Sequence, residues 1–144
     1  MKTIVDSNCL VAAVCTWHQR HAATARELAA RHRAGDDICL AAPALVEAYA
    51  VLTRLPAPHR LSPADAYTVL EANWGACELV GLTPQEHWKA LAACRDGGVG
   101  GGPTYDAVIA ACARKARAGL LLTWNVGHFE RFGDDVEVRA PADG

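Results

Sequence analysis

The sequence contains no apolar run long enough to cross a membrane. Its longest apolar stretches cover residues 9–14 and 120–124, well short of the roughly 18 residues that a membrane-spanning helix needs. A signal peptide is not expected either, because Asp6 separates Lys2 from the first apolar stretch and no clear cleavage site follows. We therefore expect a cytoplasmic protein without a membrane segment.

An excess of either charge is also missing. The chain carries 14 Lys and Arg residues against 16 Asp and Glu residues, which gives a formal net charge of −2. A protein with this balance does not coat nucleic acid through its overall charge. Any surface that binds nucleic acid must therefore be local.

Closely spaced metal-binding cysteines are absent as well. The six cysteines form no C-x-x-C pair, which favours buried, reduced thiols over disulfides or a zinc site. His18, His21 and His32 have no neighbouring arrangement of Cys or acidic residues that completes a zinc set. We expect these histidines to face solvent or RNA.

What the sequence does contain is typical of a folded α/β protein. With 144 residues, of which 51% are hydrophobic and 21% charged, residues 1–144 are expected to form a single domain. The alternation of strand-like and helix-like segments predicts a small, mostly parallel sheet of four to five strands flanked by helices. The expected strands cover residues 3–5, 38–41, 78–82 and 120–123, with a possible fifth at an edge, 136–138. The expected helices cover residues 7–14, 21–33, 43–54 and 105–117, with two more that begin after the capping residues Ser62 and Thr83. Ser7 is the expected cap of the first helix.

Three carboxylates stand where the hydrophobic pattern does not favour them. Asp6 follows the first strand at its carboxyl end, where open α/β sheets bind ligands, although capping the next helix explains it equally well. Glu47 has only apolar neighbours, which argues against a solvent-facing position, so a cation or hydrogen-bonding partner is needed. Asp106 shares its side of a helix with Ile109 and Ala110, although a first-turn acid favoured by the helix dipole is a common alternative.

Polar residues at the end of the fourth expected strand, Thr123 and Asn125, complete this set. Carboxylates brought together repel one another unless they are protonated or neutralised by a divalent cation. We therefore expect Mg²⁺ or Mn²⁺ to be held by Asp6, Glu47 and Asp106, with Asn125 as a fourth, weaker contributor. Such an ion activates water and orients phosphate, so phosphodiester hydrolysis needs no Ser or Cys nucleophile.

At four stretches the sequence resembles the PIN-domain nucleases, most closely the VapC-type toxins of bacterial toxin–antitoxin pairs. The stretches are Ile4-Val5-Asp6-Ser7-Asn8, Leu45-Val46-Glu47-Ala48, Tyr105-Asp106-Ala107-Val108-Ile109-Ala110-Ala111, and Leu122-Thr123-Trp124-Asn125 with His128-Phe129. The resemblance implies a PIN-like fold, a metal-dependent ribonuclease and a cognate antitoxin that inhibits it. It also implies that Asp6, Glu47 and Asp106 are metal-site acids. Ser7, Asn8 and Thr123 are the expected supporting residues.

The fourth acidic position departs from the family pattern. Asn125 stands where many family members have Asp, and His128 replaces a later acid. The loss of a charge argues against a second tightly held metal, although Asn can still offer a carbonyl oxygen. This departure sustains an alternative function, a catalytically weakened PIN domain that binds RNA or an antitoxin.

Possible partner surfaces are less specific. Arg20 and Arg26 could bind RNA phosphates and Trp124 could stack on a base, although a solvated helix face and core packing explain these residues as well. Apolar side chains around Tyr49 and Tyr67 could form a groove for an antitoxin or a second copy of the chain, although ordinary core packing also explains them. We expect an RNA substrate, a cognate antitoxin and a homodimer.

Overall fold

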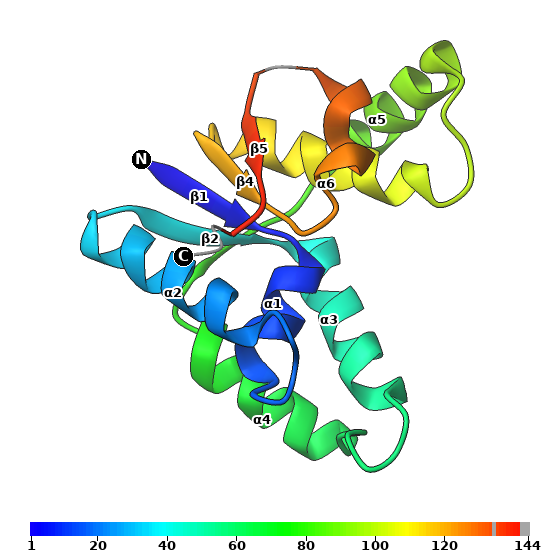
Figure 1. The fold of residues 1–144 in the computed structure, drawn as a ribbon. Helices are drawn as coiled ribbons and strands as arrows, with labels where there is room; N and C mark the ends of the chain where they lie inside the picture. Colours follow the sequence, from blue (N-terminus) through cyan, green and yellow to red (C-terminus); the bar gives the residue numbers. More distant parts are fainter. Residues whose placement is uncertain (134, 142–144) are drawn as a thin grey trace.

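Five parallel strands form the centre of the molecule. In the computed structural model, which describes residues 1–133 and 135–141, they make one sheet in the order β3-β2-β1-β4-β5 (Figure 1). The strands are β1 (Lys2–Val5), β2 (Asp37–Ala41), β3 (Glu78–Val80), β4 (Leu120–Leu122) and β5 (Glu137–Arg139). Every strand pairing is parallel. The predicted α/β class is confirmed, and the possible fifth strand is present at an edge.

Helices cover both sides of the sheet. They are α1 (Ser7–Val14), α2 (His21–Arg33), α3 (Ala42–Arg54), α4 (Pro63–Trp74), α5 (Pro84–Gly97), α6 (Pro103–Lys115) and the 3-10 helix η1 (Val126–Phe132). Figure 1 shows α1 to α4 on one side of the sheet and α5, α6 and η1 on the other. Right-handed crossover connections explain this division. From β1 through β2 to β3 the chain moves across the sheet in one direction, and from β3 to β4 it moves in the opposite direction, so the connecting helices pack on opposite faces of the sheet.

The strand order reverses between β1 and β4, and this reversal positions the site. Ile4 in β1 lies opposite Cys39 on one side and Leu121 of β4 on the other. In open α/β sheets, ligands bind in the crevice at the carboxyl ends of the strands where the order reverses. The residues that follow β1 and β4 are therefore placed at that crevice.

Local sequence signals explain most helix starts. Thr83 and Glu86 form a reciprocal capping box at α5, with Thr83 N donating to Glu86 Oε1 at 2.8 Å and Glu86 N donating to Thr83 Oγ1 at 3.1 Å. Ser62 caps α4 through a single bond, with Asp65 N donating to Ser62 Oγ at 3.1 Å. Gly98, whose φ of 68° is a conformation that favours glycine, ends α5. The expectation that the next helix begins at Tyr105 is off by two residues, because Pro103 occupies its first turn.

The core supports the expectation for the cysteines. Ile4, Leu40 and Leu122 are buried at the centre of the sheet. All six cysteines are free thiols, and five of them are buried. Among the described residues, no helix is long and apolar enough to span a membrane.

Candidate active site

Asp6 lies at the crevice between β1 and β4, only 5% exposed and held by two hydrogen bonds. Ser7 N donates to Asp6 Oδ1 at 2.8 Å, and Thr123 Oγ1 donates to Asp6 Oδ2 at 2.9 Å. Asp6 is therefore both the cap of α1 and a carboxylate at the carboxyl edge of the sheet. The expectation that Ser7 caps α1 is wrong, because Ser7 is the first helical residue and Asp6 precedes it.

Thr123 connects Asp6 to the neighbouring polar groups. Its buried hydroxyl accepts hydrogen bonds from Asn8 Nδ2 at 3.1 Å and from Asn125 N at 3.0 Å while it donates to Asp6. Asn8 Oδ1 in turn accepts from Trp124 N at 3.0 Å. The chain after β4 is thus fastened to the start of α1, and the orientation of the Asp6 carboxylate is fixed from both segments.

Two further carboxylates join Asp6 around a pocket of about 250 Å³. Glu47 comes from the middle of α3 and Asp106 from the first turn of α6. Asn125 also lines this pocket. The expectation that Glu47 avoids solvent is wrong: its side of α3 borders the pocket and the residue is exposed, as is its apolar neighbour Val46. The apolar sequence context indicated the helix, but it did not indicate which helix face the sheet leaves open.

The electrostatics of the pocket favour a bound cation. Burial raises the pKa of Asp6 most, hydrogen bonds from Ser7 and Thr123 oppose this, and the charges of Glu47 and Asp106 raise it further. The pKa of Asp106 is also raised, first by burial and then by Glu47, against a lowering effect of His128. The charges of neighbouring carboxylates thus disfavour the charged forms of Asp6 and Asp106, and a cation bound there would offset this repulsion.

The two departures from the family pattern both lie at this site. Asn125 is exposed at the rim of the pocket. His128 Nδ1 is 3.7 Å from Asp106 Oδ2. An exposed imidazole therefore stands beside one of the acids where the resemblance leads us to expect another acid.

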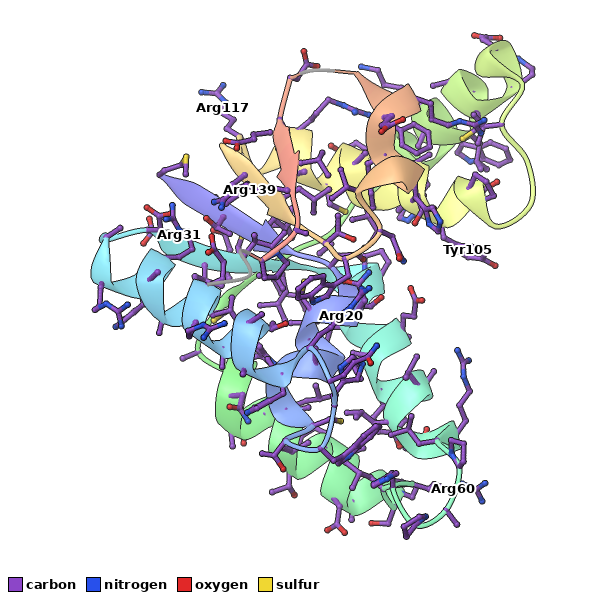
Figure 2. All side chains as sticks on the ribbon, viewed as in Figure 1. Arg20, Arg31, Arg60, Tyr105, Arg117 and Arg139 are labelled. Carbon is purple, nitrogen blue, oxygen red and sulfur yellow. The ribbon has the colours of Figure 1, made fainter. Side chains whose placement is uncertain are left out.

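A wider groove of about 1030 Å³ continues from the pocket and shares its acidic wall. It adds Arg54 from α3, Arg131 from η1 and Tyr105 from α6. Tyr105 is exposed and projects outward at the start of α6 (Figure 2). None of these three residues was expected at a site from the sequence. Arg54 had a usable signal, since it follows Glu47 by two helical turns on the same face. Arg131 lies in η1, a helix that the sequence analysis did not predict.

Two of the three side chains expected to bind RNA, Arg20 and Trp124, contact each other next to Asn125. The Arg20 guanidinium carbon is 4.5 Å from the centre of the Trp124 ring, and Trp124 Nε1 donates to Thr24 Oγ1 at 3.0 Å. Arg26 is exposed on α2. None of these three residues, Arg20, Arg26 and Trp124, lines the pocket or the groove. Their contact with RNA stays a prediction.

The donor set fits a hard divalent cation. Carboxylate and amide oxygens are preferred by Mg²⁺ and Mn²⁺, and Mg²⁺ keeps several waters while using one or two carboxylates. Within the described chain, no group of three or more His, Cys, Asp or Glu side chains is placed so that it could hold a metal ion directly. The pocket lined by Asp6, Glu47 and Asp106 would therefore hold a hydrated ion, with waters between the ion and some of the acids.

Comparison with known proteins identifies the family. Residues 3–134 match the PIN domain. The chain belongs to the PIN-domain family. This PIN domain is 38% identical, over 144 residues, to the ribonuclease VapC40 of Mycobacterium tuberculosis, with 92% of this chain and 96% of that protein covered. The chain is therefore homologous to the VapC ribonuclease toxins, which confirms the resemblance drawn from its motifs.

Solved structures show the same fold. The structure of VapBC2 from Rickettsia felis, bound to a promoter DNA fragment, matches with a TM-score of 0.71 at 15% identity, covering 97% of this chain and 98% of that one. VapC20 of Mycobacterium tuberculosis, a toxin that cleaves the sarcin-ricin loop, matches with a TM-score of 0.70 at 15% identity, covering 93% and 98%. At this identity the likeness concerns the fold alone.

Proposed function

We propose that this PIN domain, residues 1–144 acting as one unit, is the ribonuclease toxin of a toxin–antitoxin pair and hydrolyses RNA with Mg²⁺ or Mn²⁺. One observation carries the proposal. Asp6, Glu47 and Asp106 come from three separate parts of the fold and line one pocket, at the edge of the sheet where the strand order reverses between β1 and β4. Homology to VapC40 supports the same reaction. We place the activity in the cytoplasm, where cellular RNA is available.

Each site residue has a distinct task in this proposal. A divalent ion held by the acids would lower the pKa of a water and neutralise charge on the phosphate. Ser7 and Thr123 hold both oxygens of Asp6 in place, so its carboxylate needs no reorganisation when the ion and substrate arrive. The Asn125 amide orients the phosphate or the water from the rim of the pocket.

The groove supplies a binding surface for a single RNA strand. Arg54 and Arg131 attract the phosphates that flank the cleaved bond, because the acids next to them would otherwise repel the backbone. Tyr105 offers an exposed ring on which an unpaired base stacks. The basic surface thus lies locally at the site, which agrees with a net charge of −2 for the whole chain.

Cleavage assays on carboxylate variants test the proposal. Asp6→Asn, Glu47→Gln and Asp106→Asn keep the side-chain size and remove the charge, so each should abolish Mn²⁺-dependent cleavage of total RNA without unfolding the protein. Glu71→Gln, at an exposed position on α4, is the matched control and should cleave like the wild type. Full cleavage by a purified site variant, with contaminating nuclease excluded, would remove that residue from the set.

A second candidate function is a PIN domain that binds RNA or an antitoxin and cleaves poorly. The position of Asn125 at the pocket rim favours it, because an amide there holds a cation more weakly than a carboxylate. A silent wild type that gains cleavage through Asn125→Asp would establish this candidate.

Partner binding completes the proposal. We propose that a cognate antitoxin inhibits the enzyme and that the toxin forms a homodimer. Exposed apolar side chains available for such contacts include Tyr67 on α4 with Trp88 and Leu91 on α5. Light scattering of the purified protein, alone and with the product of an adjacent small gene, measures both associations.

A further inference from the structure

His18 lines the acidic pocket, although it belongs to the loop between α1 and α2 and not to any of the family-like stretches. It shares the pocket with Asp6, Glu47 and Asp106. Among the described residues that line this pocket, His18 is the one histidine, and an N–H of its imidazole ring can donate a hydrogen bond to an anion.

A backbone contact determines which ring nitrogen carries the hydrogen. Arg20 N donates to His18 Nδ1 at 3.0 Å. An amide N–H can only donate, so Nδ1 must be the unprotonated acceptor and the hydrogen of the neutral ring lies on Nε2. Burial lowers the pKa of His18, and the nearby Arg20 and His21 lower it further, so the surroundings of the ring favour its neutral form.

The loop that carries His18 is fastened to the active site. The Arg20 guanidinium stacks on Trp124, the residue before Asn125 (Figure 2 labels Arg20 where the chain enters α2). Thr24 Oγ1 donates to Arg20 O at 2.7 Å and accepts from Trp124 Nε1. On the other side of the loop, the ring of Trp17 stacks on His59 with centroids 4.0 Å apart. These contacts hold His18 at a fixed position beside the pocket.

We propose that His18 is a substrate-binding residue that donates its Nε2–H to a phosphate oxygen of the RNA in the acidic pocket. A neutral donor suits this place, because a lysine or arginine would pair with the carboxylates and compete with the divalent ion. The bond forms only when the phosphate enters, so it adds to substrate recognition without weakening metal binding. This inference rests on the proposed ribonuclease function.

Two substitutions separate a substrate contact from a role in the loop. In His18→Asn the side-chain oxygen can still accept from Arg20 N, as Asn does in turns, but the donor at the Nε2 position is lost. In His18→Gln the longer amide can place an N–H near the Nε2 position and loses the contact with Arg20. His32→Asn, at an exposed position on α2, is the control.

The proposal predicts that His18→Asn lowers kcat/KM for RNA cleavage by about tenfold to a hundredfold, the range expected for one hydrogen bond to a charged group. His18→Gln should keep most of the activity. Mn²⁺ affinity should match the wild type in both variants, and Tm should match it in His18→Asn, which keeps the contact with Arg20 N. Long-range proton–nitrogen NMR of the free protein should show the Nε2–H tautomer of His18. Activity retained in His18→Asn, equal loss in both variants or an Nδ1–H tautomer would each overturn the proposal.

Failure of the ribonuclease proposal is distinguishable from failure of this one. If the wild type cleaves no RNA, the affinities of the wild type, His18→Asn and His18→Gln for a short single-stranded RNA of mixed sequence decide the role of His18. Weaker binding by His18→Asn than by His18→Gln supports it. Equal affinity in all three proteins refutes it.

Discussion

Replacing Thr123 by Val tests whether one buried hydroxyl holds the acidic site together. In the wild type, Thr123 Oγ1 donates to Asp6 Oδ2 at 2.9 Å and accepts from Asn8 Nδ2 at 3.1 Å and Asn125 N at 3.0 Å. Valine has almost the same shape and can make none of these bonds. The substitution therefore removes the hydrogen bonds with little change in packing.

The expected loss of stability follows from the kind of bond that is removed. A hydrogen bond to a charged group contributes about 1.5–3 kcal/mol and a neutral one about 0.5–1.5 kcal/mol to the free energy of unfolding. Asn125 is exposed, so water replaces its lost partner and the cost comes mainly from Asp6 and Asn8. We expect the unfolding free energy to fall by about 2–4 kcal/mol. A fall of about 3 kcal/mol lowers Tm by roughly 6–12 °C in a chain of this size.

Urea unfolding and RNA cleavage measure the effect together. Thr123→Ser is the matched control, since it keeps the hydroxyl and loses one methyl group. Thr123→Val should also lower cleavage by about tenfold to a hundredfold, the usual cost of losing a group that orients a metal ligand. If Val and Ser variants have the same stability and the same activity, the hydroxyl does not orient Asp6 and the reasoning fails.

Four other predictions follow from the same site and from one surface pair. Mn²⁺ should raise the free energy of unfolding of the wild type by about 2.7 kcal/mol at a hundredfold excess over Kd; thermal melts with no metal-dependent shift would contradict a shared acidic site. Because the folded-state pKa of Asp6 is raised above 3.8, its contribution to stability is present at low pH and is lost as pH rises through the folded pKa. In EDTA, the free energy of unfolding of the wild type should therefore rise relative to that of Asp6→Asn as the pH falls from 7 to about 4. Urea titrations that give the same difference at both pH values would count against this. Asn125→Ala should weaken cleavage and Asn125→Asp should tighten Mn²⁺ binding in calorimetry, because it restores an anionic oxygen; unchanged cleavage and affinity would place Asn125 outside the site. Lys115 and Thr83 lower the pKa of Glu86 to about 2, so this carboxylate stabilises the protein above its ordinary pKa of 4.5 and loses that effect as pH falls toward 2. Glu86→Gln should therefore lower Tm at pH 7 and much less near pH 2, and an equal loss at both would refute it.

Residues whose role depends on near neighbours in the chain were predictable. The capping box of Thr83 and Glu86 is a three-residue signal, and the structure contains it. The short β-branched run before Asp6 predicts a strand that ends at this residue, and β1 does end at Val5. Because the carboxyl ends of parallel strands lie at the same edge of a sheet, the edge that bears Asp6 was predictable as well. The sequence of strands and helices therefore predicted both the sheet and the edge that bears the acids.

Contacts between distant segments were not predictable in the same way. Glu27 falls within the predicted helix 21–33, yet the structure buries it, and its carboxylate accepts a hydrogen bond from Arg139 Nη2 at 2.9 Å. Arg31 lies near the same carboxylate, with 3.4 Å between Arg31 Nε and Glu27 Oε1. Nothing near Glu27 in the chain indicates that β5 passes beside α2.

The sequence by itself determined the parallel α/β fold, the strand ends at which Asp6 and Thr123 stand, and the family to which the chain belongs. These depend on hydrophobic periodicity, capping and short motifs, which are local properties. Only the tertiary structure decided that Glu47 faces solvent at the pocket, that Thr123 orients Asp6, and that His18 lies beside the acids. Those facts depend on how helices cross and which faces they leave open, and such packing joins residues that no local pattern connects.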